Sequence, residues 1–316
     1  MEKKVWVLAD ERKGGTNQLL GIAEGLGWPY EVKDILYNKW IFLPNIIRGA
    51  TLIGVTKQTR TQLAGPWPDL VLSAGRRTYP VALNIKKRSG GKTKIVQVLS
   101  PESFYKPDLL ILPMHNKYKG SDPDVIQILG ALNRVTPQKL TEERQKWTSR
   151  LSSYPAPRVA LIVGGATKDK EFPKEMAEKL FYQTLELKPS SFFVTTSRRT
   201  PADVVQFLKE AIPQPRFFYD VTEGGENPYF GFLALADTIV VTGDSISMCS
   251  ECCATGKPVY IFGPDEMIGE KHKRFLEDLY EKQYAVPLGA KASSGMRKLN
   301  DMPFVLERIK KMFEEQ

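Results

Sequence analysis

The sequence predicts an α/β protein made of two tandem parallel units, and three observations support this prediction. Short apolar runs alternate with segments of helical periodicity along the chain. The length of 316 residues favours two domains of roughly 150 residues each over one core. A Pro/Ser-rich break at 152–157 separates two stretches that each begin with an apolar strand followed by Gly-Gly. We therefore expect an N-terminal domain at residues 1–153 and a C-terminal domain at 154–302, with the final helix, 303–316, able to pack back on the first.

The N-terminal half begins with strand, glycine turn and helix. Residues 5–10 are an apolar run typical of a buried strand, and Lys13-Gly14-Gly15-Thr16 interrupts it before a helix at 17–26. A second unit follows as a strand at 70–73, the turn Gly75-Arg76-Arg77 and a helix at 80–87, where proline fits a first helical turn. Apolar runs at 95–99 and 109–113 predict two more strands, and a charged helix is expected at 141–151.

The same pattern restarts after the break. Apolar and β-branched runs predict strands at 159–163, 192–195, 217–219, 238–241 and 259–262. Helical segments between them are expected at 173–187, 200–211, 228–236 and 247–255. Alternation of this kind is typical of Rossmann-like domains.

Charge and hydropathy limit the classes of partner. The chain has 45 Lys+Arg and 36 Asp+Glu, a net charge of +9 and a pI of about 9.2, which favours an anionic partner. Nucleic acid is not expected, because the basic residues are scattered and no aromatic-basic recognition motif occurs. The longest uncharged run, 227–236, is too short to span a bilayer, and the N-terminus does not resemble a signal peptide. We expect a cytoplasmic protein, with a peripheral position on the inner face of a membrane as the alternative.

The three cysteines, Cys249, Cys252 and Cys253, are one helical turn apart in a predicted helix. Three thiols lack the fourth ligand of a structural zinc site, and the two histidines, His115 and His272, are distant in sequence. We interpret the cysteines as small buried apolar residues and expect no metal site.

Candidate site residues lie where predicted strands end. In open parallel sheets, ligands bind outside the carboxyl ends of the strands, where helix N-termini present free N–H groups. Gly14-Gly15 and Gly164-Gly165 follow the first strand of each half, as a backbone that approaches a phosphate would. Each pair alone is equally compatible with a tight turn, since neither matches a dinucleotide or P-loop motif.

The segment 241–251 is the most specific of these candidates. It places Asp244, Ser245 and Ser247 between a strand end and a helix start, a density of polar groups that suits a diphosphate. Glu251, about two turns on, could accept hydrogen bonds from both ribose hydroxyls. The alternatives are an ordinary N-cap for Ser245 and a solvated helix residue for Glu251.

Basic residues stand near the same strand ends. The doublets Arg76-Arg77 and Arg198-Arg199 could pair with phosphate, although a surface doublet is often only solvated. Lys271 opens a basic helix start with His272 that could contact an anion. His115 follows a predicted strand and is a candidate base, and a loop histidine bound to a carbonyl is the alternative.

The segment 40–47, Trp-Ile-Phe-Leu-Pro-Asn-Ile-Ile, is flanked by Lys39 and Arg48. A core segment is the commoner reason for such a run. An exposed aromatic patch with cations around it could instead rest on an anionic membrane.

These residues together make the chain resemble the bacterial relatives of the plant mitochondrial-fission protein named for elongated mitochondria, a family to which glycosyltransferase activity is often attributed. The resemblance covers nearly the full length. It is carried by Asp10 with Gly15 and Asn17-Gln18, Ser73-Ala74-Gly75-Arg76-Arg77, Gly130 with Arg134-Val135-Thr136, Gly164-Gly165, Thr195-Thr196-Ser197-Arg198-Arg199-Thr200-Pro201, Asn227-Pro228-Tyr229, and Asp244-Ser245-Ile246-Ser247-Met248 through Glu251 and Gly256-Lys257-Pro258.

The resemblance implies a GT-B-like fold, with two Rossmann-like domains that face a cleft. Residues 250–258 are similar to the donor-binding helix of the peptidoglycan enzyme MurG, which implies that Glu251 holds the donor ribose. The donor-binding set expected on this basis is Gly164, Gly165, Thr196, Arg198, Asp244, Ser245, Ser247, Glu251 and Lys271. On the acceptor side we expect Gly14, Gly15, Asn17, Arg76 and Arg77. The chain departs from a typical relative at 13–17, where a Gly-His pair is absent, so Asp10 or His115 would have to serve as the base.

Two functions follow from the sequence. The first, and the leading one, is a metal-independent glycosyltransferase that takes a sugar from a nucleotide-diphosphate-sugar to an acceptor that could be lipid-linked or part of the cell envelope. The nucleotide-sugar is its co-substrate, and no cofactor is expected. The second is a non-catalytic adaptor at a membrane surface, as the plant relatives imply. Sequence alone does not choose between them, because one fold supports both.

Overall fold

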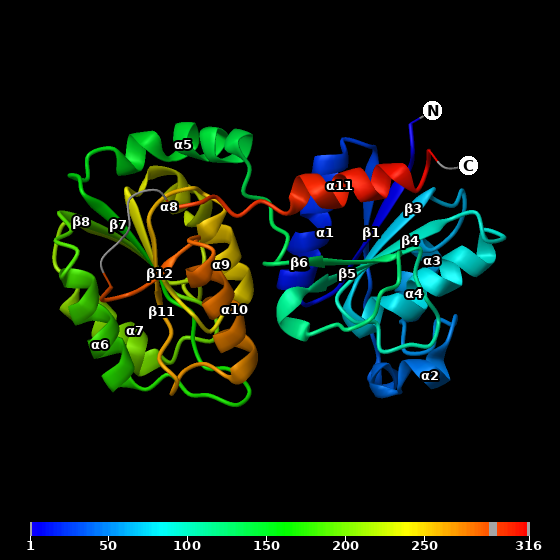
Figure 1. Cartoon of the computed structure of the whole chain (residues 1–316), viewed down its shortest axis with the longest axis horizontal. Helices are drawn as coiled ribbons and strands as arrows, with labels where there is room; N and C mark the ends of the chain where they lie inside the picture. Colours follow the sequence, from blue (N-terminus) through cyan, green and yellow to red (C-terminus); the bar gives the residue numbers. More distant parts are fainter. Residues whose placement is uncertain (1, 291–295, 315–316) are drawn as a thin grey trace. The chain divides into compact units, whose positions relative to one another are not determined.

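The computed structural model describes residues 2–290 and 296–314, which divide into two compact units (Figure 1). The first unit comprises Met1–Arg134 and Asp301–Gln316, and the second comprises Val135–Asn300. The described residues of each unit form one six-stranded sheet in which every strand pair is parallel. The predicted α/β class with two tandem Rossmann-like units is confirmed.

The first unit has the strand order β2-β1-β3-β4-β5-β6. Its elements are β1 (Val5–Ala9), α1 (Lys13–Leu26), β2 (Tyr30–Asp34), the 3-10 helix η1 (Lys39–Phe42), α2 (Asn45–Arg48), α3 (Lys57–Gln62), β3 (Leu70–Ala74), α4 (Gly75–Arg88), β4 (Lys94–Val98), β5 (Leu109–Pro113), η2 (Met114–Asn116), β6 (Val125–Ile128) and α11 (Met302–Lys311).

The central strand β1 is apolar throughout because both faces of this sheet are covered. Val5 and Val7 pack into the core that includes α1 and α11, whereas Trp6 and Leu8 pack into the core on the side of α4. A strand buried on both sides needs a continuous apolar run, which is why the sequence indicated it so clearly.

The second unit has the strand order β12-β11-β10-β7-β8-β9. Its elements are α5 (Pro137–Leu151), β7 (Arg158–Ile162), α6 (Lys174–Leu185), β8 (Ser191–Thr195), α7 (Ala202–Ala211), β9 (Arg216–Tyr219), α8 (Tyr229–Leu235), β10 (Thr238–Thr242), α9 (Ile246–Cys253), β11 (Val259–Phe262), α10 (Glu270–Glu281) and β12 (Val286–Pro287).

In each sheet, the direction in which successive strands are added reverses once. Ligands of such sheets bind at the point of this reversal. In the second unit, β7 and β10 are neighbours while the chain leaves them toward opposite edges of the sheet. The corresponding pair in the first unit is β1 and β3. At such a switch point the loops after two adjacent strands diverge and leave a crevice at the carboxyl edge.

Several elements differ from the sequence prediction. The strands β2, β6 and β12 were not predicted, and β2 is hard to recognise because it is an edge strand with the polar sequence Tyr-Glu-Val-Lys-Asp. Helix α1 begins at Lys13 and α4 at Gly75, so Gly14, Gly15, Arg76 and Arg77 lie in first helical turns and not in loops. The last two residues of the predicted final helix, 315 and 316, lie outside the described residues.

The division between the units lies before α5, at 134/135, and not at the expected 153/154. Trp147 of α5 is buried against Gly231 of α8, where the absence of a side chain gives the indole room. Tyr154 packs edge-on against Phe193, so the Pro/Ser-rich segment lies against the second sheet and is not a linker. Both contacts join residues far apart in sequence, which the local composition could not indicate.

Helix α11 packs on α1 in the first unit. Val305 and Ile309 are fully buried there, and Asp301 accepts hydrogen bonds from the amides of Leu129 and Gly130 at 3.0 and 3.3 Å. The last helix therefore completes the core that the first 134 residues begin.

We expect Ile309→Ala to destabilise the first unit by roughly 2–5 kcal/mol, because it removes buried methyl groups and leaves a cavity under α1. Urea unfolding followed by circular dichroism measures this loss. The neighbouring exposed residue provides the control, and Lys310→Ala should change the free energy of unfolding by less than about 0.5 kcal/mol. Equal effects of the two changes would show that α11 is not part of this core.

Candidate functional site

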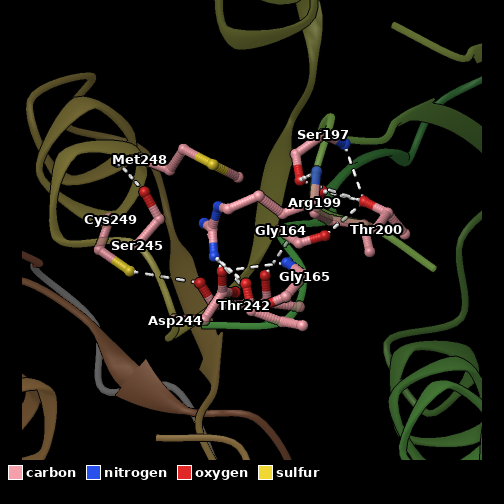
Figure 2. Close-up of polar contacts among 12 residues, drawn as sticks. Gly164, Gly165, Ser197, Arg199, Thr200, Thr242, Asp244, Ser245, Met248 and Cys249 are labelled. Atoms are coloured by element: carbon pink, nitrogen blue, oxygen red, sulfur yellow. Dashed lines mark hydrogen bonds and ion pairs between the residues drawn. The ribbon is translucent and has the colours of Figure 1, made fainter. Parts of the chain in front are cut away.

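Three loops meet at the switch point of the second sheet (Figure 2). They follow β7, β8 and β10, which are adjacent strands in the order β10-β7-β8. The amide of Gly164 donates to Thr242 Oγ1 at 2.7 Å, and the amide of Gly165 donates to Asp244 Oδ2 at 3.0 Å. The loop after β7 is thus bound to the loop after β10 by side chains of the latter.

The loop after β8 is held by Arg199. Its Nη2 lies 2.7 Å from Asp244 Oδ2, and its Nη1 donates to the carbonyl oxygens of Gly165 and Ala166 at 3.3 and 2.8 Å. Thr200 Oγ1 also donates to the carbonyl of Gly164. Figure 2 shows the Arg199 guanidinium pointing at Asp244. A single carboxylate therefore contacts both neighbouring loops.

The two glycines serve close packing in this arrangement. A Cβ at Gly164 would collide with both carboxylate oxygens of Asp244, and one at Gly165 would collide with the carbonyl of Arg199. Since both amides already donate to side chains, they are not free to bind a phosphate. That Gly164 and Gly165 lie near a diphosphate stays a prediction, in which other groups than these two amides would contact the phosphates.

Asp244 is a fully buried carboxylate. Its Oδ2 accepts the two hydrogen bonds described above, while its Oδ1 has no partner among the described residues. Burial of an anion is costly unless it is paired, and Arg199 provides that pair. Asp244 is thus placed to hold the three loops together.

The start of α9 offers the free donors of this edge. Ser245 is its N-cap and accepts from the amide of Met248 at 3.4 Å. The amides of Ile246 and Ser247 donate no hydrogen bond within the part of the chain that the structure describes. Ser245 and Ser247 are half-buried, so their hydroxyls lie near the surface beside these amides. A helix start of this kind attracts an anion.

Arg198 and Thr196 differ in their accessibility. Arg198 is exposed and forms no ion pair with a described residue. Its neighbour Arg199 is the one that is committed to Asp244. Thr196 is buried and donates to Asp220 Oδ1 at 3.3 Å, on the side of the sheet toward β9. Arg198 is therefore the guanidinium of this loop that remains free for a ligand.

Glu251 lies in a buried pair with Tyr229. The Tyr229 hydroxyl donates to Glu251 Oε2 at 2.6 Å, which joins α8 to α9. Burial raises the pKa of Glu251 to about 7, although the hydrogen bond from Tyr229 acts in the opposite direction. Glu251 is 8% exposed, so it is not the solvated helix residue that was the alternative. The Glu251 carboxyl is thus held in place, and with a pKa of about 7 it is partly protonated at neutral pH.

The start of α10 brings two more titratable groups to this region. Burial, followed by the charge of Arg274, lowers the pKa of Lys271. Burial also lowers the pKa of His272, which feels the opposing charge of Asp244. Sequence reasoning noted His272 only as part of a basic helix start. The charge interaction with a residue 28 positions earlier is what associates it with the site.

The cysteines of α9 are buried, as the sequence indicated. Cys249, Cys252 and Cys253 are free thiols with at most 1% exposure. Burial raises the pKa of each thiol, so they remain protonated and apolar.

The first unit gathers its candidates at its own switch point. Asp10 follows β1, and its Oδ1 accepts from the amide of Arg12 at 2.9 Å. Gly14, Gly15 and Asn17 lie in the first turns of α1, and Gly15 allows that helix to approach Ala74 at the end of β3. The expected acceptor residues at the start of α1 therefore lie beside the end of β3, where Arg76 and Arg77 follow.

Both arginines of the doublet Arg76-Arg77 are paired. Arg77 forms an ion pair with Glu11, and Arg76 Nε lies 3.9 Å from Glu102 Oε2. Their side chains are mostly covered while the two glutamates are exposed. An incoming anion would have to compete with these carboxylates, in contrast to Arg198 in the second unit.

His115 does not lie beside Asp10. It belongs to η2 after β5 and is 3% exposed. Three strand spacings separate β1 from β5, which places the two strand ends about 14 Å apart. The two candidate bases cannot act at the same atom from this sheet edge, and the burial of His115 disfavours it.

Comparison with known proteins identifies the family. The model of the mitochondrial fission ELM1 family matches residues 13–313. The chain belongs to this family. It is 31% identical to the protein RP120 of Rickettsia prowazekii over 89% of both chains. It is 28% identical to the mitochondrial fission protein ELM1 of Arabidopsis thaliana, over 68% of this chain and 56% of that protein.

Solved structures with the same fold are nucleotide-sugar proteins of the GT-B type. The UDP-GlcNAc 2-epimerase of Methanocaldococcus jannaschii, in complex with UDP-GlcNAc and UDP, has a TM-score of 0.55 at 13% identity and covers 99% of this chain and 100% of its own. UGT89C1 of Arabidopsis thaliana, complexed with UDP, has a TM-score of 0.54 at 10% identity over 97% and 90%. The glycosyltransferase SsfS6 of Streptomyces sp. SF2575, complexed with thymidine diphosphate, has a TM-score of 0.50 at 15% identity over 100% of both chains. At these identities the similarity establishes the GT-B-like fold of this ELM1-family chain.

The buried Glu251 predicts a specific pH dependence of stability. Its pKa of about 7 in the folded protein exceeds the unfolded value of 4.5, so its stabilising contribution is complete below pH 4.5 and is lost as the pH rises through 7. Between pH 5 and pH 8, the wild type should lose roughly 2–3 kcal/mol relative to Glu251→Gln, which keeps the shape and cannot ionise. Denaturant unfolding of both proteins at the two pH values measures this difference. Parallel pH profiles would contradict the burial of an ionisable carboxyl here.

Proposed function

We propose that the second unit binds a nucleoside-diphosphate sugar at the carboxyl edge of its sheet, and that the protein transfers the sugar to an acceptor bound by the first unit. The observation that supports the proposal best is the switch point itself, where the free amides at the start of α9 lie beside the loops tied by Asp244. Fold relatives that hold UDP or thymidine diphosphate support the same ligand class.

The diphosphate would be bound by groups from three elements. The amides of Ile246 and Ser247 would donate to the phosphate oxygens, with the hydroxyls of Ser245 and Ser247 beside them. Arg198 would supply a full positive charge from the loop after β8, and Lys271 a second from α10. These groups would also stabilise the negative charge that develops on the departing diphosphate.

The ribose would be recognised by Glu251. Its carboxylate can accept hydrogen bonds from hydroxyl groups, and Tyr229 fixes its orientation through the 2.6 Å hydrogen bond. A carboxyl with a pKa of about 7 gains ribose hydroxyl donors most readily when it is ionised. Tyr229 would thus act as a positioning residue for the nucleoside.

The transfer step would use Asp10 as the base if the reaction inverts the anomeric centre. The acceptor hydroxyl would lose its proton to the Asp10 carboxylate as its oxygen attacks the anomeric carbon, and the bond from that carbon to the diphosphate would break. Asp10 is partly accessible at the end of β1, whereas His115 is buried. Arg76 and Arg77, once released from their glutamates, would contact an anionic part of the acceptor.

A non-catalytic adaptor at a membrane surface is the second candidate. Membership of a family with a mitochondrial fission protein favours it, as does the burial of the only histidine near a strand end of the first unit. An adaptor built on this fold could retain nucleotide binding or have lost it, so binding and turnover must be measured separately.

Calorimetric titration of the full chain with UDP, GDP, ADP and CMP tests the donor site. At least one nucleotide should bind, and Arg198→Ala should weaken that binding by about tenfold or more, since it removes a charge-assisted hydrogen bond. Arg150→Ala, which removes an exposed arginine of α5 in the same unit, is the matched control and should leave the dissociation constant unchanged.

The corresponding nucleotide sugars, incubated with the protein and cell-envelope extract, then distinguish the candidates. Release of free nucleotide that depends on Asp10 supports transfer. Binding without release favours the adaptor, and a well-folded protein that binds none of the nucleotides would refute the donor site.

A further inference from the structure

In the segment Lys39–Arg48 of the first unit, most apolar side chains are exposed and polar side chains are buried. The segment forms η1 and α2, and its inward-facing residues are Ile41, Asn45 and Arg48, at positions i, i+4 and i+7. Two of these three buried side chains are polar. Trp40, Phe42, Ile46 and Ile47 lie on the outside. The expectation of a core segment is therefore wrong for most of this run, because the apolar side chains face solvent.

Polar contacts hold this segment firmly in place. Asn45 Nδ2 donates to the carbonyl oxygens of Arg76 and Pro101, both at 2.6 Å. The fully buried Arg48 donates to the carbonyls of Ile53 and Arg77 and to Asn45 Oδ1, at 3.2, 3.3 and 3.2 Å. Arg48 has no carboxylate partner in the described part of the chain, and burying an arginine in this way costs free energy, so the hydrogen bonds above are what maintain its orientation.

A second loop enlarges the exposed apolar surface. Phe104 and Tyr105 follow Pro101, to which Asn45 is bound, and Tyr105 lies against Gly49 at the end of α2. The Tyr79 hydroxyl donates to the Tyr105 carbonyl at 2.8 Å and fixes this loop. We call the set Trp40, Phe42, Ile46, Ile47, Phe104 and Tyr105 the apolar tip. Its members are between 56% and 81% exposed. Figure 1 shows α2 at the lower end of the first unit, away from the sheet.

Lys39 adjoins the apolar tip, and Lys57 stands three residues after the glycine that packs on Ile41. Lys39 precedes Trp40, and its Nζ lies 5.9 Å from the centre of that indole. Lys57 begins α3, which follows Gly54, and Gly54 packs on the backbone of Ile41. Neither lysine forms an ion pair with any residue in 2–290 or 296–314. Exposed aromatic and aliphatic side chains with free cations at their edge match the headgroup boundary of a bilayer that contains anionic lipids.

We propose that the apolar tip and its two lysines dock the first unit on an anionic lipid bilayer. Trp40 and Phe42 enter the region between headgroups and acyl chains, Ile46 and Ile47 follow them, and Lys39 and Lys57 contact lipid phosphates. No helix among the described residues is long and apolar enough to cross a membrane, and docking requires none. The inference is independent of the proposed transfer reaction, since it depends on the first unit's surface alone.

Sedimentation with vesicles tests the proposal on the full chain. We expect binding to phosphatidylcholine vesicles that contain about a third phosphatidylglycerol, and much weaker binding to phosphatidylcholine alone. Phe42→Ser with Ile46→Ser should reduce the partition coefficient by about tenfold or more. Lys39→Gln and Lys57→Gln should each reduce it by about fivefold and only on anionic vesicles.

Two controls show whether vesicle binding depends on the apolar tip in particular. Tyr182→Ser removes an exposed aromatic side chain of α6 in the second unit and should bind vesicles like the wild type. Trp40 is the one exposed tryptophan among those described, so a blue shift of tryptophan emission on anionic vesicles should disappear in Trp40→Phe while most binding remains.

The proposal fails if the wild type does not bind anionic vesicles, or if the Phe42/Ile46 double variant binds as well as Tyr182→Ser. It also fails if that double variant converts a dimer to a monomer in solution without any change in vesicle binding, because the tip would then be an interface between copies of the chain.

Discussion

The carboxylate of Asp244 is the interaction on which the arrangement of the second unit depends. It is fully buried, accepts a hydrogen bond from the Gly165 amide and pairs with Arg199. The loops after β7, β8 and β10 are therefore joined through this one carboxylate. The topology brings these three strands side by side, but parallel pairing does not fix the loops beyond their ends. The ion pair between the buried Asp244 and the partly exposed Arg199 does. It also leaves Arg198 and the first amides of α9 unoccupied at the same edge, which is what makes this edge a candidate anion site.

The carboxyl edges of the two sheets differ in how their charges are used. In the first unit, Arg76 and Arg77 are paired with Glu102 and Glu11, so their positive charge is already offset. In the second, Arg199 is paired within the fold while Arg198 remains available. This asymmetry favours the second unit as the place for the proposed diphosphate, because an anionic group at the first unit would have to compete with Glu102 and Glu11. Family membership does not distinguish a glycosyltransferase from a non-catalytic adaptor, because a GT-B-like fold is compatible with both.

Much of the fold could be predicted from sequence, because strands buried on both faces, such as β1 and β10, need uninterrupted apolar runs. The polar edge strand β2 carries no such signal. The glycines at 164 and 165 are also recognisable in the sequence as candidates for a close backbone approach. The groups that they approach are not, because Thr242 and Asp244 lie nearly 80 residues away. Likewise, the doublet Arg198-Arg199 does not indicate which of its two guanidinium groups forms the ion pair with Asp244. At 40–47, the apolar run is compatible with a core segment and with an exposed patch. The buried Asn45 and Arg48 reveal that most of its apolar side chains face outward.

A nucleoside diphosphate at the edge where α9 begins, as we propose, would change the surroundings of the amides there. Amide nitrogen–proton NMR spectra of the full chain, recorded with and without the nucleotide that binds best, test this proposal at the level of single residues. We expect the resonances of Ile246 and Ser247 to move most, because their free N–H groups acquire phosphate acceptors. Those of Gly164 and Gly165 should move little, because their hydrogen bonds to Thr242 and Asp244 persist. Large changes confined to the first unit, with the α9 amides unmoved, would contradict the proposal.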